Sequence, residues 1–134
     1  MKKIEKNGII YAAYDSLDTL DKKGPVWYGE DKEWLQVSRM HHDRGKTVLA
    51  HMHKFRPRTV EHTQECLIGI KGSAKASIYD KDKNLIDSVV LTSGDTVSFF
   101  RGYHSLEVLE DGTVYFEIKN GPFTNIEEDK EFLV

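Results

Sequence analysis

The chain has 134 residues, of which 19 are basic and 22 are acidic, and its formal net charge is −3. The two signs are interspersed, so no broad basic face is available for a phosphate backbone, and nucleic acid is not expected as a partner. No run approaches the roughly 20 apolar residues of a membrane helix, and the first residues lack the apolar stretch of an export signal. We therefore expect a cytoplasmic protein with no membrane partner.

The length predicts a single domain spanning residues 1–134, because a chain of this size buries enough surface for one core. The only cysteine, Cys66, lies in an apolar stretch and is expected to be a buried, unreactive thiol. A lone cysteine excludes an intrachain disulfide and a cysteine-rich zinc site. Trp27 and Tyr28, beside Gly24 and Pro25, predict an apolar edge, and we expect a homodimer to cover it.

Short segments rich in β-branched and aromatic residues follow one another along the chain, bounded by turn residues. Nine of them are predicted strands: 8–14, 34–39, 46–55, 65–71, 74–80, 85–91, 96–100, 104–109 and 114–118. Two segments, 16–20 and 127–132, are predicted to be single helical turns. Many short strands and almost no helix predict an all-β, antiparallel fold, as a sandwich, jelly roll or barrel.

Histidine, glutamate and glycine recur at fixed spacings in three places. These are Gly45 with His51 and His53, Glu65 with Gly72, and Gly94 with Gly102 and His104. Side chains at i and i+2 point to the same face of a strand, so His51 and His53 can offer both rings to one ion. Glu65 begins an apolar strand, where an unpaired carboxylate is costly, and it therefore requires a partner.

These three places together resemble the two signature motifs of the cupin superfamily. The resemblance implies an antiparallel cupin-type jelly roll, or double-stranded β-helix barrel, with a core at about residues 34–120. It also implies a metal site built from His51, His53, Glu65 and His104. Three imidazoles and a carboxylate suit a divalent transition metal, Zn, Mn, Fe, Ni or Cu, better than Mg or Ca.

The interval between His53 and Glu65 leaves a second metal site open. Eleven residues separate the two, a much longer interval than in the cupin motif. A more compact site would use His62, with Gln64 or Glu65, beside His104 and would leave part of the first histidine pair free. Both arrangements are consistent with the sequence.

Several polar residues near the predicted site are candidates for binding a ligand. Arg56 and Arg58 present planar donors that suit a carboxylate or a phosphate, or else they lie on a solvated loop. Gln64 and Tyr103 can hydrogen-bond a sugar. In a site without metal, Glu65 would lie at the rim and bond to Arg58 or to backbone amides.

Residues 63–122 are similar to a group of small single-domain cupins associated with cell-surface saccharide biosynthesis. The similarity implies a small-molecule ligand, a saccharide or nucleotide sugar, and metal-assisted isomerase or epimerase chemistry, or oxygen activation by Fe(II). A second interpretation is a metal-independent keto-sugar isomerase in which His51 or His53 is the acid/base and Glu107 or Glu61 a further base. A third is a ligand-binding module that is not an enzyme.

Overall fold

The computed structural model describes residues 1–20 and 22–133, and its regular structure is nearly all β. The strands are β1 (Lys2–Lys6), β2 (Ile9–Asp15), β3 (Gly24–Trp27), β4 (Ser38–His41), β5 (Glu65–Lys71), β6 (Ala74–Tyr79), β7 (Leu85–Leu91), β8 (Thr96–Phe99), β9 (Tyr103–Val108) and β10 (Val114–Lys119). A 3-10 turn, η1 (Leu17–Thr19), and one short helix, α1 (Ile126–Asp129), complete the described part. No helix in these residues is long and apolar enough to cross a membrane.

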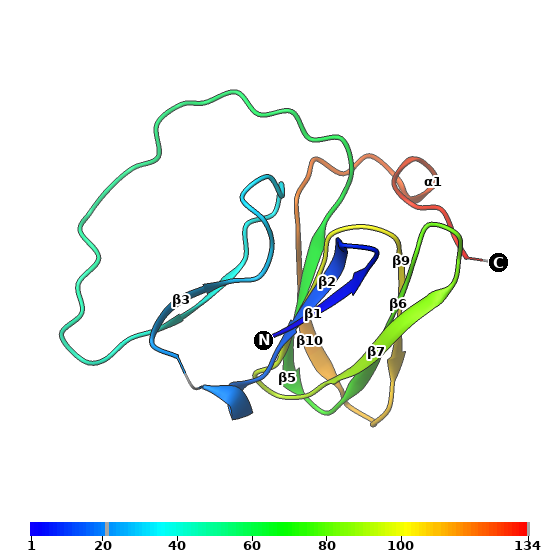
Figure 1. Ribbon diagram of the computed structural model, residues 1–134, viewed down its shortest axis with the longest axis horizontal. Coiled ribbons are helices and arrows are strands. Elements are labelled where there is room, and N and C mark those ends of the chain that lie inside the picture. Colours follow the sequence, from blue (N-terminus) through cyan, green and yellow to red (C-terminus); the bar gives the residue numbers. More distant parts are fainter. Residues whose placement is uncertain (21, 134) are drawn as a thin grey trace.

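Two antiparallel sheets form the body of the molecule (Figure 1). One has five strands in the order β1-β2-β8-β5-β10, and the other has three in the order β7-β6-β9. Their facing side chains share one core, which includes Ile4, Ala12, Leu67, Val97 and Phe99 from the first sheet and Ala76, Ile78, Val89 and Leu91 from the second. The two sheets therefore form a β-sandwich, because each buries one face against the other.

The third sheet is the hairpin of β3 and β4, which packs on the outer face of the five-stranded sheet. Its side of the contact includes Tyr28 and Val37, which lie against Ile10, Ala13 and Phe100. Side chains alternate along a strand, so a strand such as β5 buries Leu67 toward the core and turns Cys66 toward the hairpin. The five-stranded sheet is therefore covered on both faces at β2 and at the end of β8, whereas β10 at its edge stays exposed.

Most predicted strands are confirmed, and one is wrong. The predictions 65–71 and 85–91 match β5 and β7, and both predicted helical turns are present in shortened form. Residues 46–55, predicted as a strand, have no regular structure and are exposed throughout. A strand is stable when another strand pairs with its backbone and one of its faces is buried. Residues 46–55 pair with no strand in this arrangement and have no buried face. The predicted strand at 34–39 is displaced, and β4 begins only at Ser38.

The prediction missed two strands, β1 and β3, and for β1 the sequence carries a signal. β1 and β2 form a hairpin that turns at Asn7 and Gly8, whose φ angles are 53° and 75°. An Asn-Gly pair is a strong hairpin signal, since both residues tolerate the left-handed backbone that a tight turn requires. The alternation of Lys3, Ile4 and Glu5 before it buries only Ile4.

Candidate functional site

Glu65 and His104 meet at one end of the sandwich, although they belong to different sheets. Glu65 is paired with Phe99 in the ladder of β5 and β8, and His104 with Ile78 in the ladder of β6 and β9. Phe99 and Ile78 are core residues, and paired residues point to the same face of a sheet, so Glu65 and His104 both point between the sheets. There the Nε2–H of His104 donates a hydrogen bond to the Glu65 carboxylate.

Aromatic packing fixes the orientation of the His104 ring. The ring stacks on Phe99 with their centroids 4.1 Å apart and their planes 9° from parallel. The His104 side chain keeps 33% of its surface exposed and that of Glu65 only 11%. The imidazole is therefore held on one face by Phe99 and at one nitrogen by Glu65, while part of it is open to a ligand.

The environment of Glu65 favours the ionised carboxylate. The hydrogen bond from His104 is the largest influence and lowers the pKa of Glu65, and burial opposes it. The net effect is a pKa below the ordinary value of 4.5. A buried carboxylate that stays ionised can orient an imidazole or bind a metal cation.

A cavity of about 550 Å3, the His104 cavity, opens beside this pair. Lys81 and Lys130 contribute to its wall, and the carboxyl-terminal residues Phe132 and Leu133 form another part of it. This terminal segment is tied to the sandwich by hydrogen bonds from Tyr103 Oη to Glu131 and from Thr63 Oγ1 to Asp129, both 2.6 Å long. The cavity therefore combines the His104–Glu65 pair with Lys81 and with Lys130 of the tethered segment.

His51 and His53 lie far from this cavity, in the exposed segment that arches away from the sandwich (Figure 1). Their rings are neighbours, with centroids 5.4 Å apart, as the i, i+2 spacing predicts. The Nδ1 atom of His51 lies 2.7 Å from the Leu49 carbonyl oxygen within the same segment. The structure thus joins two of the four predicted ligands, and in residues 1–20 and 22–133 no three His, Cys, Asp or Glu side chains are grouped to hold a metal.

The alternative ligands His62 and Gln64 have structural contacts instead. His62 Nε2 lies 3.1 Å from the Phe100 carbonyl oxygen. The His62 ring packs edge-on against the Trp34 ring, with the two ring centroids 4.2 Å apart. Gln64 is 1% exposed, and its amide bridges Glu33 and the backbone of Leu35. Both side chains contact the layer outside the five-stranded sheet, and neither joins the His104–Glu65 pair.

The remaining candidates are dispersed. Arg56, Arg58 and Glu61 lie in the same exposed stretch as the first histidine pair. Tyr103 and Glu107 lie in β9 at odd positions, so they point away from the face that carries His104. Tyr103 still borders the His104 cavity, because it is adjacent in sequence to His104.

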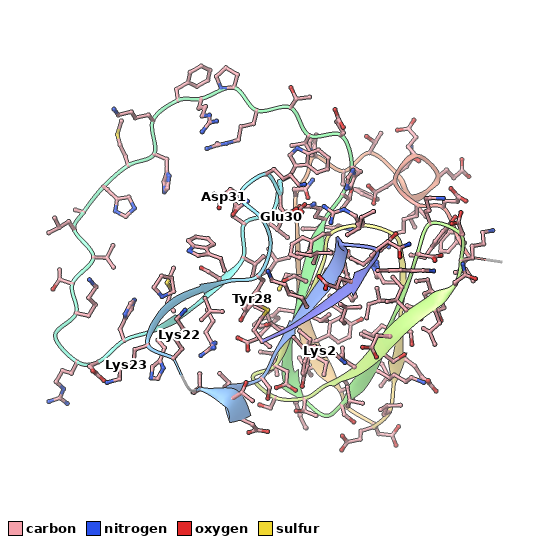
Figure 2. All side chains as sticks on the ribbon, viewed as in Figure 1. Lys2, Lys22, Lys23, Tyr28, Glu30 and Asp31 are labelled. Atoms are coloured by element: carbon pink, nitrogen blue, oxygen red, sulfur yellow. The ribbon has the colours of Figure 1, made fainter. Side chains whose placement is uncertain are left out.

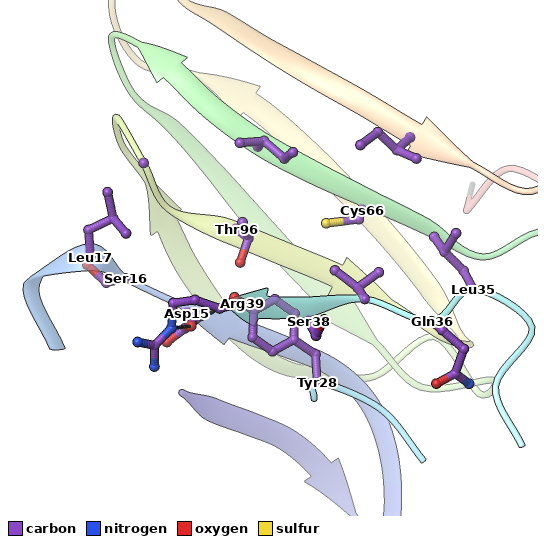
Figure 3. Close-up of a pocket in the computed structure, with 14 residues that line it drawn as sticks. Asp15, Ser16, Leu17, Tyr28, Leu35, Gln36, Ser38, Arg39, Cys66 and Thr96 are labelled. Carbon is purple, nitrogen blue, oxygen red and sulfur yellow. Dashed lines mark hydrogen bonds and ion pairs between the residues drawn. The ribbon is translucent and has the colours of Figure 1, made fainter. Parts of the chain in front are cut away.

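A second cavity, of about 440 Å3, lies between the hairpin and the five-stranded sheet (Figure 3). At one end, Tyr28 Oη and Arg39 Nε donate to Asp15 Oδ2 at 2.8 and 2.6 Å. Burial and, to a smaller extent, the hydrogen bond to Asp15 together raise the pKa of Tyr28 to about 12. Sequence reasoning missed this cluster, whose only signal is a charge, Asp15, at the end of an apolar strand.

Comparisons with family models, with curated proteins and with solved structures found no match. The function therefore has to be argued from the geometry and chemistry of the site, because a β-sandwich by itself is compatible with many functions.

Proposed function

We propose that this protein binds a divalent transition metal and a small polar ligand at the His104–Glu65 pair. The observation that carries the proposal is the convergence of one imidazole and one ionised carboxylate, from opposite sheets, beside a cavity. Imidazole nitrogen and carboxylate oxygen are the donors that Zn, Mn, Fe, Ni and Cu accept together. The facing sheets and the position of this pair at one end of the sandwich support the cupin-type jelly roll.

The proposed site uses His51 and His53 as its other two protein ligands. The two rings already lie side by side, and the segment that carries them makes no ladder with the sandwich. The segment can therefore supply its histidines to a metal site, in its own chain or in a second copy, without breaking a strand pairing. If only one of the two rings reaches the ion, water or the substrate completes the coordination, which is the arrangement that catalytic metal sites use.

The proposed ligand is a saccharide or a nucleotide sugar. The wall of the His104 cavity holds two ammonium groups, Lys81 and Lys130, that can bind a phosphate or diphosphate, while the carboxylates Asp129 and Glu131 in the same wall are hydrogen-bonded to Thr63 and Tyr103. Arg56 and Arg58 lie on the same segment as the histidine pair and would arrive with it. A volume of about 550 Å3 is within the range of small-molecule sites. Isomerase or epimerase chemistry, with the metal polarising a carbonyl, is the reaction that we propose.

Elemental analysis of the purified protein tests the metal site. Wild-type protein should hold one transition metal per chain, and His104→Ala and Glu65→Gln should lose most of it. His51→Ala and His53→Ala should lose metal if the segment completes the site, whereas His42→Ala, an exposed histidine outside it, should not. His62→Ala tests the compact alternative. A wild-type protein without stoichiometric metal, after growth with each of the five metals, would contradict the proposal.

One observation favours a second function, acid/base catalysis without metal. The direct hydrogen bond between His104 and Glu65 is the arrangement by which a carboxylate orients a catalytic imidazole. In this version His104 moves the proton of a keto-sugar, in place of the base that the sequence suggested at residue 51 or 53. Turnover of keto-sugars that chelator leaves unchanged and His104→Ala abolishes would support it. Ligand binding that raises the melting temperature without any turnover would instead indicate a binding module.

A further inference from the structure

Two strands at the open side of the sandwich have an unpaired edge. Among the strands that the structure describes, β9 pairs only with β6, and β10 pairs only with β5. An exposed edge presents a row of free N–H and C=O groups that accepts another strand. β9 also exposes 56% of the Val108 surface at this edge, so its side chains are incompletely covered as well.

The segment 46–55 has the composition of a strand but no partner. Side chains of Val48, Leu49, Met52 and Phe55 are 69%, 81%, 85% and 95% exposed. Figure 2 shows the side chains of this arch standing apart from those of the sandwich. Four large apolar side chains within eight residues, all in water, indicate a surface that another molecule covers.

The segment of the same chain is not placed to cover its own β9. It leaves from His41, the last residue of β4, and β4 is held by β3 on the outer face of the five-stranded sheet. From there the chain swings outward on the side away from β9 before it returns at Glu65 (Figure 1). A neighbouring molecule can present the same segment to β9 without any change in this hairpin.

We propose that two copies of this chain exchange residues 46–55, each adding an antiparallel strand to the free edge of the other's β9. Strand addition of this kind takes its affinity from the backbone ladder, and a two-fold axis makes the exchange reciprocal. Charge is complementary in the register that places residues 49–54 opposite 103–108, because Lys46 then lies opposite Asp111. Arg56 falls opposite Arg101 in this register, just beyond the exchanged residues.

The same register brings the histidine pair to the His104 cavity. His53 lies opposite His104, and His51 lies opposite Leu106, which packs against the core from the same face of β9. Paired residues point to the same side of a sheet, so both imidazoles enter the space that holds Glu65. Each site is then composite, with Glu65 and His104 from one copy and the histidine pair from the other. This last step rests on the proposed function, whereas the strand exchange does not.

Cysteine cross-linking tests the exchange directly. Met52 and Ser105 are opposite each other in the proposed register and both point away from the core, so M52C and S105C should form a disulfide. A mixture of M52C chains with affinity-tagged S105C chains should give a covalent heterodimer under oxidising conditions, and neither variant alone should give that product. The native Cys66 is only 2% exposed, so it should form no cross-link in either variant or in the wild type. The double variant M52C/S105C should run as a covalent dimer.

Light scattering of the untagged protein provides the second measurement. The exchange predicts twice the chain mass of 15.4 kDa. Along a strand, every second residue directs its N–H to the same neighbouring strand, and proline has no N–H. One of L49P and A50P must therefore remove a hydrogen bond to β9 in the proposed dimer. At least one of the two variants should be a monomer with an unchanged circular dichroism spectrum. Ala50→Ser keeps the N–H and should leave the dimer intact.

Three outcomes would overturn the exchange, and they are separate from failure of the metal site. A monomeric wild type, a double variant that closes its disulfide within one chain, or a dimer that both proline variants leave intact each contradicts it. A cross-linked dimer that holds no metal would keep the exchange and reject the metal site. Mixed dimers of His104→Ala chains with His51→Ala/His53→Ala chains should regain one metal site per dimer only if both proposals hold.

Discussion

Gln64 donates a 2.6 Å hydrogen bond to Glu33 on the face of the sheet opposite to its neighbour Glu65. Its amide oxygen accepts from the Leu35 backbone at 2.9 Å, and its nitrogen also lies 3.3 Å from the Phe100 carbonyl oxygen. Glu33 in turn accepts from Arg101 Nη2 at 2.6 Å. Gln64 therefore fastens the loop before β4 to the edge of the site.

Gln64→Ala should destabilise the protein by about 3 kcal/mol, because it removes one hydrogen bond from the buried Glu33 carboxylate, which keeps its bond from Arg101, and takes away the acceptor of the Leu35 backbone N–H. Chemical denaturation measures this change. Gln36→Ala is the matched control: Gln36 is exposed, its amide donates to loop carbonyls, and its loss should cost about 1 kcal/mol or less. Equal losses for the two variants would show that Gln64 has no special structural role.

Gly102→Ala should destabilise the protein and shift the backbone that carries His104 into its cavity. Gly102 has a φ of 77°, and an added Cβ would lie 2.3 Å from the Tyr79 carbonyl oxygen. The left-handed backbone costs a side chain about 1–2 kcal/mol, and the close approach adds about 1–3 kcal/mol through displacement of the backbone. Because His104 follows two residues later, its hydrogen bond to Glu65 should weaken.

Gly112→Ala separates these two effects. Gly112 has a similar φ of 72°, but an added Cβ would meet only Lys71 Nζ at 4.0 Å. It should show the cost of the backbone conformation alone, and Gly102→Ala should be less stable than Gly112→Ala by about 1 kcal/mol or more. Thermal unfolding compares them. Equal melting temperatures would contradict the close contact at Gly102.

The sequence predicts the strands of the sandwich better than it predicts the site. β5 and β7 are short, mostly apolar segments that lie between clear turn residues. Their local sequence pattern therefore agrees with the strands that the structure contains. Glu65 and His104 are 39 positions apart, and their meeting depends on the pairing of β8 with β5 and of β9 with β6. The cupin resemblance placed these two residues in one metal site with His51 and His53, and of those four the structure brings Glu65 and His104 together.

The segment 46–55 shows where local pattern is insufficient. Its alternation and its β-branched residues favour a strand, but a strand forms only where another backbone pairs with it. The Asp15 cluster was missed for a related reason. Asp15 ends β2, Tyr28 directly follows β3 and Arg39 lies in β4. No spacing in the sequence indicates that a carboxylate, a phenol and a guanidinium from these places will share one buried position.

Tyr103→Phe should loosen the carboxyl-terminal segment over the His104 cavity. The hydrogen bond from Tyr103 Oη to Glu131 is 2.6 Å long, and it also raises the pKa of Tyr103. Its loss should increase proteolytic cleavage after residue 126, while the sandwich stays intact, because both partners lie outside the core. Tyr115→Phe removes a hydroxyl from β10 and is the control. A cleavage rate equal to that of the wild type would show that other contacts hold this segment.

Asp15 should make the attachment of the β3–β4 hairpin sensitive to acid. Burial opposes its ionisation, but hydrogen bonds from Tyr28, Arg39 and the amino terminus prevail and hold its pKa below the ordinary value of 3.8. A carboxyl group with a lowered folded-state pKa stabilises the fold fully above its unfolded pKa. This contribution is lost as the pH falls below about 3.8 and passes through the lowered value.

Asp15→Asn should therefore remove about 3 kcal/mol of stability at pH 7, since it removes the ion pair between residue 15 and the buried Arg39 guanidinium. The deficit relative to wild type should shrink as the pH falls below about 3.8 and through the lowered pKa, where folded wild-type Asp15 also becomes neutral. Tyr28→Phe keeps the ion pair, should cost only about 1 kcal/mol, and should retain the acid dependence. Unfolding by urea from pH 2 to pH 7 measures all three proteins. A deficit for Asp15→Asn that does not change with pH would show that hydrogen bonding, and not the charge of Asp15, holds the hairpin on the sheet.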